Sequence, residues 1–330
     1  MTHAPVTGAV VIGCGLVGQK RAVALEELSV PVVGLVDTDD ARAAELAAAL
    51  RDAPPIFTDV SSACAADGAE LAIVATTHDG LAGSAIAALD AGCHVLIEKP
   101  GACDHVQLTE VTEAARRSER VVRIGYNHRF HPAVLEARRL VTSGSFGPLM
   151  SLRARYGHGG RLGYESEWRA DASRGGGELL DQGSHLVDLV RFFAGDVELE
   201  FAELRTDFWD MEVEDNAYLA LRIRDGGFAW LHASWTEWKN LFAVEIAMRD
   251  ARLDVIGLGG SYGPERLVVH AMRPELGPPD TTEQVYDCPD RSWAAELEDV
   301  LGEIAGRPSL GARLDDGLAV LTVVDQARRP

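Results

Sequence analysis

Lysine is scarce in this chain. Only three of the 31 basic residues are lysines, namely Lys20, Lys99 and Lys239, and the others are arginines. Arginine stays protonated at any working pH, whereas a lysine ammonium group can release its proton. Lys99 lies between Glu98 and Pro100, directly after the apolar run His94–Ile97. A lysine at the end of a predicted strand therefore indicates chemistry, and the alternative is a surface lysine in a turn.

Cysteine, long apolar runs and positive net charge are equally rare or missing. The five cysteines are scattered and contain no C-x-x-C pair, so we expect neither a disulfide framework nor a metal site. No run of 18 apolar residues is available to span a bilayer, and we expect no signal peptide and a cytoplasmic protein. The net charge of −20 argues against a nucleic acid or an anionic membrane as partner, because both would repel the chain.

The pattern of predicted strands and helices changes near residue 127. Before it, short β-branched runs alternate with helical stretches rich in alanine and leucine, which predicts a doubly wound parallel sheet. After it, strand-like runs follow one another, separated by turn signals such as Arg224-Asp225-Gly226-Gly227, which predicts a large open, mainly antiparallel sheet. We therefore predict an α/β protein with a first domain at residues 1–127 and an α+β domain at 128–330.

A glycine-rich hexapeptide, Gly13-Cys14-Gly15-Leu16-Val17-Gly18, lies between the first predicted strand and the first predicted helix. Glycine allows a tight turn and the close approach of a pyrophosphate, which the free N–H groups of the helix N-terminus then bind. Asp37 follows the second predicted strand, 19 residues after Gly18, and is placed to accept hydrogen bonds from a ribose 2′-hydroxyl. The first domain is therefore predicted to be a Rossmann dinucleotide-binding domain, and the alternative is a purely structural turn.

Asp37 also predicts which nicotinamide cofactor is used. A 2′-phosphate would meet Asp37 with Asp39 and Asp40 close by in the sequence, and no arginine follows immediately. Like charges would repel the phosphate, whereas ribose hydroxyls would donate to the carboxylate. We therefore predict NAD over NADP.

Polar residues recur along the predicted helix Glu178–Ala194. Asp181, His185 and Asp188 are spaced i, i+4, i+7 and so share one face of a regular helix. A carboxylate beside an imidazole favours the protonated ring, which suits proton transfer near neutral pH. The pattern predicts general acid–base chemistry. The alternatives are a structural histidine, with Asp181 serving the helix N-terminus, and a metal site made of Asp181 and His185.

Together these segments resemble the Gfo/Idh/MocA oxidoreductase family, named for glucose–fructose oxidoreductase and inositol dehydrogenase. The resemblance covers nearly the whole chain and depends on the order and spacing of modest segments. They are Gly13–Gly18, Glu98-Lys99-Pro100, Gly125–Pro132, Trp168-Arg169 and Gly175–Asp188.

The resemblance implies an NAD-dependent oxidoreductase acting on CH–OH groups of sugars, cyclitols or their derivatives, and a homodimer or homotetramer formed through the C-terminal sheet. The segment Tyr156–Arg161 is similar to that of members acting on nucleotide-linked or amino sugars. Lys99, Asp181 and His185 match the catalytic residues, and with Asn127 and Arg129 they would contact the substrate. The implied cofactor contacts are Gly13, Gly15, Leu16, Val17, Gly18, Asp37, Thr76, Thr77, His78, Glu98, Lys99, Trp168 and Arg169.

Two other functions are compatible with the same sequence. An NAD-dependent glycosidase would use the fold for a transient oxidation without net redox change. A non-catalytic dinucleotide or sugar sensor would keep the fold, although it has no need of the three catalytic matches together. Three arginines of the second domain would suit a phosphate or carboxylate on the substrate, or else lie on the surface. They are Arg153, Arg155 and Arg161.

Overall fold

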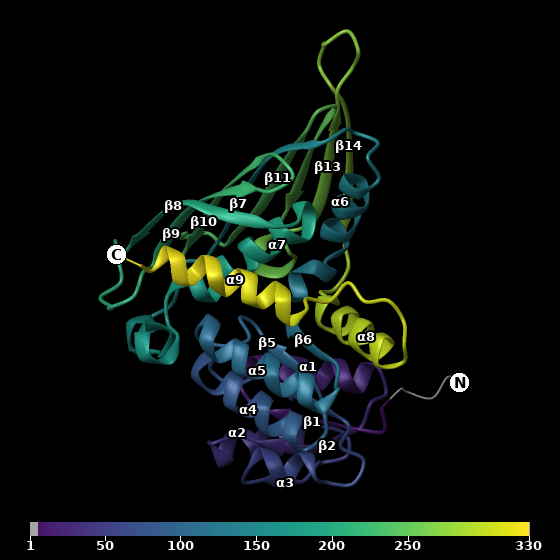
Figure 1. Cartoon of the computed structure of the whole chain (residues 1–330), viewed down its shortest axis with the longest axis vertical. Coiled ribbons are helices and arrows are strands. Elements are labelled where there is room, and N and C mark those ends of the chain that lie inside the picture. The colour runs from purple at the N-terminus through teal and green to yellow at the C-terminus, as the bar shows by residue number, and fades with distance from the viewer. Residues whose placement is uncertain (1–5, 330) are drawn as a thin grey trace. The chain divides into compact units, whose positions relative to one another are not determined.

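Apolar runs of four or five residues form the central strands of the first unit of the protein. In the computed structural model, which describes residues 6–329, β1 (Ala9–Ile12) and β4 (Leu71–Val74) are wholly buried. The strands pair in parallel in the order β3-β2-β1-β4-β5-β6. Figure 1 labels β1, β2, β5 and β6 of this sheet. The other four are β2 (Val32–Val36), β3 (Ile56–Phe57), β5 (His94–Glu98) and β6 (Val122–Gly125). This confirms the predicted doubly wound parallel sheet.

Alanine-rich helices connect these strands. They are α1 (Leu16–Glu27), α2 (Asp40–Ala49), α3 (Val60–Cys64), α4 (His78–Asp90) and α5 (His105–Ser118). The first unit comprises residues 6–127 together with Ser292–Ala319, which contains α8 (Ser292–Ile304) and the first part of α9 (Leu314–Ala327). Leu297 and Val300 of α8 share one core with Leu25 of α1. The division into functional domains at residues 127 and 128 stays a prediction.

The second unit, His128–Arg291 and residues 320–329, contains a large sheet in the order β14-β13-β12-β11-β7-β10-β9-β8. Among the described strands of this sheet, only β7 and β10 pair in parallel, so the prediction of a mainly antiparallel sheet is confirmed. The strands are β7 (Leu149–Gly157), β8 (Val197–Arg205), β9 (Asn216–Ile223), β10 (Phe228–Ser234), β11 (Leu241–Met248), β12 (Ala251–Ile256), β13 (Glu265–Ala271) and β14 (Asp280–Tyr286).

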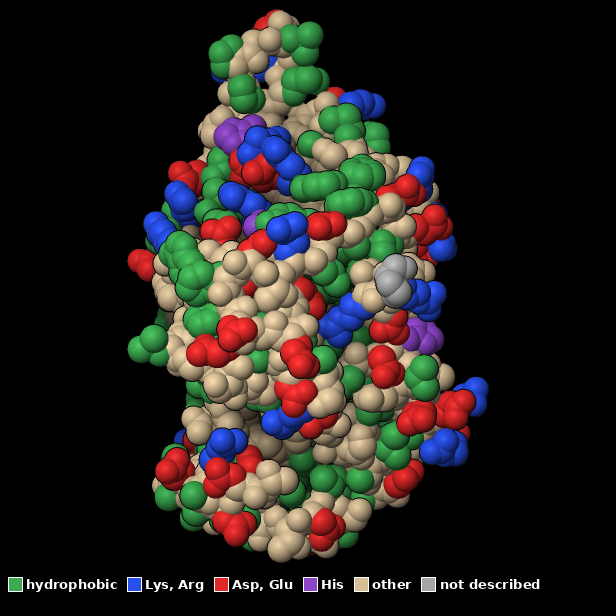
Figure 2. All heavy atoms as spheres, turned by 90° about the vertical axis from the view of Figure 1, so that its left-hand side faces the viewer, with side chains coloured by type: hydrophobic (Ala, Val, Ile, Leu, Met, Phe, Trp, Pro, Cys, Tyr) green, Lys and Arg blue, Asp and Glu red, His purple; other side chains and the backbone are tan. Residues whose placement is uncertain are grey.

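The two faces of this sheet differ. One face packs against α6 (Pro132–Thr142) and α7 (Ser184–Ala194). The other face carries exposed ion pairs between neighbouring strands, such as Arg153 with Glu245, and the stacked rings of Phe201 and Trp230. Figure 2 shows charged side chains of both signs interspersed with apolar ones on the visible surface of the protein. Alternation along each strand thus separates a packed face from a mixed, exposed one.

Among the strands and α-helices of residues 6–329, sequence patterns missed β3, α3 and β14. β14 is almost wholly exposed and polar, so it carries no alternating apolar signal. Within residues 6–329, none of the helices has the length and apolar character needed to cross a lipid bilayer.

A buried carboxylate organises the connection between β8 and β9. Asp215 is inaccessible to solvent, and its side chain accepts hydrogen bonds from the backbone N–H groups of Asp207, Phe208 and Trp209 at 2.8–3.0 Å. Burial alone would raise the pKa of this carboxyl, but these donors outweigh it and hold the pKa below its usual value of 3.8. The indole of Trp209 joins the cluster around Trp235, so the bonds also fix part of the core.

Replacing Asp215 by asparagine should destabilise the second unit by about 2 kcal/mol at pH 7, because an amide cannot accept all three bonds. A lowered pKa stabilises the folded state above the unfolded value and loses that effect as pH falls through the folded value. In thermal unfolding from pH 7 to pH 2, the gap between wild type and Asp215→Asn should therefore stay constant down to about pH 5 and then shrink. A gap that widens in acid would contradict this account.

Candidate active site

At two positions of the glycine-rich turn after β1, Gly13 and Gly18, no residue larger than glycine fits. A Cβ atom on Gly13, whose φ is +93°, would lie 2.4 Å from the backbone oxygen of Ala75. A Cβ atom on Gly18 would lie 1.8 Å from the oxygen of Gly13. A Cβ atom on Gly15, by contrast, would meet nothing within 4 Å. The turn is therefore closed toward the protein and open beside Gly15, as the close approach of a pyrophosphate requires.

The N-terminus of α1 is suited to an anion. Gly15 occupies the N-cap position, so no side chain caps the helix, and its first turn holds no acidic residue. The first N–H groups of a helix carry its partial positive charge. Leu16, Val17 and Gly18 present these groups, and they fit the pyrophosphate of a dinucleotide.

Asp37 is fixed at the carboxyl end of β2 by the glycine-rich turn itself. Its Oδ2 accepts from the backbone N–H of Cys14 at 2.6 Å, and its Oδ1 accepts from that of Asp39 at 2.8 Å. Burial and the nearby Asp37 raise the pKa of the Cys14 thiol to about 12, so this thiol stays protonated. Each carboxylate oxygen has a second lone pair, so the oriented Asp37 retains acceptor sites for ribose hydroxyls.

Glu98, the last residue of β5, belongs to a buried ion triad. Arg21 is fully buried, and its guanidinium donates to Glu98 Oε1 at 2.6 Å and to Glu296 Oε2 at 2.5 Å. The ring of Trp293 lies 4.6 Å from the same guanidinium. The Glu98 carboxylate is thus held by the protein, while its predicted contact with the cofactor stays a prediction. Lys99 follows immediately at the carboxyl edge of the sheet and is partly exposed.

Other predicted residues of the first unit lie at the same edge. Thr76 and Thr77 follow β4, and Thr77 Oγ1 donates to Asp79 Oδ1 at 2.5 Å where α4 begins with the buried His78. Asn127 follows β6, and its Nδ2 donates to Ser292 Oγ at 2.8 Å. Carboxyl ends of parallel strands are where α/β sheets bind ligands. The structure thus gathers Gly13–Gly18, Asp37, Thr76–His78 and Lys99 along one edge, and their contacts with cofactor stay predictions.

The predicted regular helix Glu178–Ala194 is wrong in its first part. Residues Leu179–Gly183 form a π-helical turn, and only Ser184–Ala194 is α-helical. The wider turn removes the simple i, i+4, i+7 alignment. Asp188 instead pairs with Arg129, whose Nε and Nη2 donate to its two oxygens at 2.8 and 2.6 Å. Arg129 and Asp188 are both buried, so the structure gives Arg129 a structural partner, and its predicted substrate contact stays a prediction.

His185 lies in a group of aromatic side chains. Its ring stacks on His128 with centroids 3.9 Å apart and an angle of 29° between the planes. Tyr156 meets both imidazoles edge-on or tilted, at 6.0 and 5.1 Å. Phe242 lies 5.7 Å from His128. Sequence reasoning missed His128 in this role, although its place in the Gly125–Pro132 segment marked the neighbourhood.

Arg169 and Asp181 form an ion pair beside the π-helical turn. Arg169 Nε lies 3.0 Å from Asp181 Oδ2, and Nη1 of the same guanidinium lies 3.4 Å from Glu167. The guanidinium also stacks over the ring of Trp168 at 4.5 Å. The predicted pair Trp168-Arg169 is therefore tied to the predicted catalytic carboxylate within the second unit.

Three tyrosines complete this part of the second unit: Tyr156, which begins the segment Tyr156–Arg161 noted in the sequence, and Tyr164 and Tyr262, which were not foreseen. Burial raises the pKa of Tyr156 well above its usual value, and hydrogen bonding with Tyr262 and the charges of Asp181 and Glu178 raise it further. Burial also raises the pKa of Tyr164 and of Tyr262, and for Tyr262 burial outweighs the lowering effect of the neighbouring Tyr156 and Gln182. All three phenols therefore stay protonated and can both donate and accept. No local sequence pattern brings these residues together.

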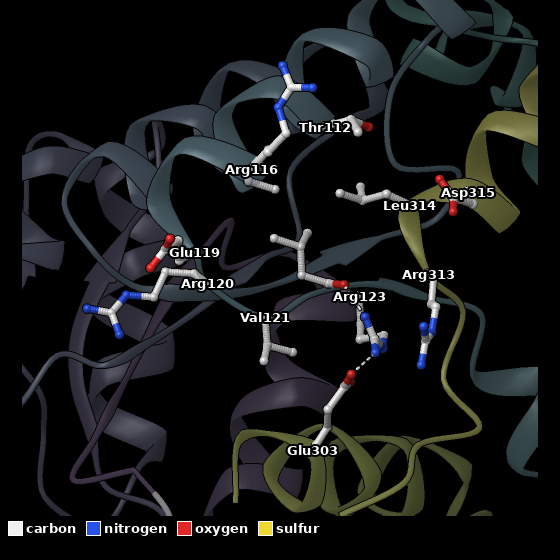
Figure 3. Close-up of a pocket in the computed structure, with 12 residues that line it drawn as sticks. Thr112, Arg116, Glu119, Arg120, Val121, Arg123, Glu303, Arg313, Leu314 and Asp315 are labelled. Atoms are coloured by element: carbon white, nitrogen blue, oxygen red, sulfur yellow. Dashed lines mark hydrogen bonds and ion pairs between the residues drawn. The ribbon is translucent and has the colours of Figure 1, made fainter. Parts of the chain in front are cut away.

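A cavity of about 410 Å³ in the first unit lies elsewhere (Figure 3). It includes Arg123, near the amino end of β6, which pairs with Glu303 of α8. Burial lowers the pKa of Arg123, the charge of Glu303 raises it, and the neighbouring charge of Arg313 lowers it further. The amino ends of parallel strands face away from the edge that carries Gly13 and Lys99. This cavity therefore forms no part of the candidate site.

Two family models match most of the chain. Residues 7–126 match the model of an oxidoreductase family with an NAD-binding Rossmann fold, and residues 134–262 match that of the GFO/IDH/MocA C-terminal domain. The first match lies in the unit that contains the glycine-rich turn, and the second lies in the unit that contains the π-helical turn.

Relatives of known activity are similar over much of the chain. D-glucoside 3-dehydrogenase of Escherichia coli (strain K12) is 26% identical over 256 residues, or 72% of this chain and 70% of that protein. Inositol 2-dehydrogenase 2 of Saccharopolyspora erythraea is 27% identical over 222 residues, or 66% of this chain and 63% of that protein. The solved structure of levoglucosan dehydrogenase with NADH and levoglucosan has a TM-score of 0.83 at 20% identity, covering 97% of this chain and 96% of that one. This last similarity shows the shared fold.

Proposed function

Because the chain belongs to the GFO/IDH/MocA family of NAD-binding oxidoreductases, we propose that it interconverts a secondary alcohol and a ketone on a sugar, cyclitol or sugar derivative. It is an NAD(P)-dependent dehydrogenase acting on CH–OH groups, like its relatives. The main structural support for this assignment is the glycine-rich turn, which is open beside Gly15 and holds Asp37 in a fixed orientation next to it. NAD, when bound, accepts or supplies the hydride.

We assign the remaining chemistry to three side chains. His185 takes the hydroxyl proton of the substrate during oxidation and returns it during reduction. Lys99 donates a hydrogen bond to the same oxygen and stabilises its developing negative charge. Asp181, held by Arg169 at 3.0 Å, orients the substrate or His185. Stacking on His128 restricts the orientation of the His185 ring, which favours reproducible proton transfer.

We further propose a homodimer or homotetramer assembled through the exposed face of the second unit's sheet, in a cytoplasmic protein. The exposed Trp230 and Phe201 on that face, framed by ion pairs, are the kind of mixed surface that subunit interfaces use.

The test is a panel of sugars, cyclitols and amino sugars assayed with NAD at 340 nm. We expect lasting NADH formation with at least one neutral compound. NADP is the matched control, and we expect at least tenfold lower kcat/KM with it, because a 2′-phosphate would face the carboxylate of Asp37. Release of free sugar without lasting absorbance would indicate a glycosidase instead. Binding of NAD without turnover of any compound would indicate a sensor.

A further inference from the structure

Two of the scattered cysteines lie against each other in the first unit. Cys64 is the last residue of α3, and Cys93 directly precedes β5. The Sγ atom of Cys93 lies 3.8 Å from the backbone oxygen of Cys64 and 3.6 Å from that of Ala69. Both cysteines are free thiols in this structure. Because they are 29 positions apart, no spacing motif marks the pair in the sequence.

The two sulfur atoms are close enough to influence each other. A carbonyl oxygen is two bonds from the Cα atom of its own residue, so the Cys93 sulfur lies beside the backbone that carries the Cys64 side chain. Each thiol is also the largest influence on the pKa of the other, as expected of neighbouring groups that titrate together. The pair is therefore placed for a disulfide, which requires such close approach.

The surroundings of the two thiols differ. The thiol of Cys64 and the charge of Arg120 lower the pKa of Cys93 by more than burial and the charge of Glu70 raise it. The thiol of Cys93 and burial both raise the pKa of Cys64. Because the thiolate is the nucleophile in thiol oxidation, Cys93 is the cysteine that reacts first, and Cys64 is the resolving thiol.

The pair lies just below the surface of the first unit. Cys64 is 4% exposed, and Cys93 is fully buried. The helix α3 is only five residues long, and Ser61, Ser62 and Ala65 around Cys64 are exposed. Short segments with few buried residues open locally at a low free energy. Such opening admits an oxidant as small as a peroxide.

We infer that Cys64 and Cys93 form a redox-modification site, at which a peroxide converts the two thiols into a reversible disulfide. The Cys93 thiolate attacks one peroxide oxygen, so that an S–O bond forms and the O–O bond breaks, giving a sulfenic acid and hydroxide. The Cys64 thiol then attacks the Cys93 sulfur, which forms the S–S bond and releases water. The hydroxide takes up the proton that Cys93 lost. The two sulfurs thus give up two electrons, and the peroxide is reduced to two molecules of water.

The site lies away from the edge of the sheet that is predicted to bind the cofactor. Cys93 precedes the amino end of β5, whereas Lys99 follows the carboxyl end of the same strand. These two ends lie at opposite edges of a parallel sheet. Oxidation therefore links α3 to the start of β5 and leaves the glycine-rich turn after β1 unchanged. We expect the disulfide to alter the stability of the first unit and not its affinity for NAD.

The test uses the full chain with Cys103→Ser and Cys288→Ser, which removes the two cysteines that are not buried and retains Cys14, Cys64 and Cys93. The protein is treated with hydrogen peroxide, its remaining thiols are alkylated after unfolding, and its peptides are analysed by mass spectrometry. We expect the alkylated thiols to fall from three to one, with Cys64 and Cys93 in one cross-linked species that dithiothreitol separates. Persistence of all three thiols, or oxidation of Cys14 in preference to the pair, would overturn the inference.

Cys64→Ser in the same background is the matched variant. Cys93 then has no resolving thiol, so peroxide should convert it to a sulfinic acid that dithiothreitol does not reduce. A Cys93 that stays a thiol in this variant would contradict its assignment as the cysteine that reacts first. Circular dichroism shows whether the variant is folded.

Thermal unfolding and NAD titration measure the effect of the bridge. The disulfide closes a loop across 29 positions, so oxidation should raise the unfolding temperature of the first unit by at least about 3 °C. NAD affinity, measured by fluorescence, should change less than about twofold, because the bridge lies at the opposite edge of the sheet. A lower unfolding temperature of the bridged protein would show that the native fold does not accommodate the bond, and it would overturn the inference.

Discussion

Replacing Lys99 by methionine should lower kcat by at least about a hundredfold while NAD binding stays nearly intact. Lys99 lies at the carboxyl end of β5, where the parallel sheet presents its ligand-binding edge. Methionine keeps the length and apolar stem of the side chain but cannot donate a hydrogen bond to a developing oxyanion. Steady-state kinetics with the best substrate of the panel, together with NAD titration by fluorescence, would measure both quantities.

The scarcity of lysine supplies a clean control for this experiment. Lys239→Met changes the same side chain at an exposed position of the second unit and should leave kcat unchanged. A Lys99→Met protein with full activity would remove Lys99 from the mechanism. Equal loss of NAD affinity and of kcat would mean that Lys99 serves the cofactor rather than the reacting oxygen.

Replacing Arg21 by methionine should destabilise the first unit by about 3–5 kcal/mol. The fully buried guanidinium of Arg21 holds both Glu98 and Glu296, so its removal leaves two carboxylates in a low-dielectric interior without their cation. In thermal unfolding followed by circular dichroism, the loss corresponds to roughly 10 °C in the transition of this unit. We also expect kcat to fall, because Glu98 directly precedes Lys99.

Two further variants separate charge burial from general disruption. Arg222→Met removes a guanidinium from an exposed pair with Glu200, and its unfolding temperature should stay within about 2 °C of wild type. Combining Arg21→Met with Glu98→Gln and Glu296→Gln removes the orphaned charges and should restore part of the lost stability. If the triple variant were no more stable than Arg21→Met alone, burial of unpaired charge would not be the cause.

The first unit could be predicted largely from its sequence because local rules determine it. Apolar runs alternate with helical stretches, and the turn after β1 demands glycine at Gly13 and Gly18 whatever else the chain does. The position of Lys99 at a strand end follows from the same pattern. What the sequence did not reveal is the partner of each buried charge. Glu98 was expected to face the cofactor, and its carboxylate is held by Arg21, 77 positions away.

The surroundings of Asp181 and His185 could be predicted only in part, because the residues there come from distant segments. Asp181 and His185 were foreseen from one stretch of chain, but the π-helical turn between them was not. His128 stacks on His185 and the ring of Tyr262 lies beside that of Tyr156, and no local pattern encodes such contacts. Arg129 illustrates the same limit, since its partner Asp188 lies 59 positions along the chain.

The π-helical turn at Leu179–Gly183 behaves as a one-residue insertion that the helix has absorbed. In a regular α-helix each residue advances the chain by about 100°, so an added residue would rotate every later side chain by that angle. Here the wide turn accommodates the additional residue. The apolar side of α7 therefore stays against the sheet, and the turn that contains Asp181 and Gln182 also contacts the sheet. Gain or loss of one residue at this point thus turns His185 relative to Asp181 without altering either side chain.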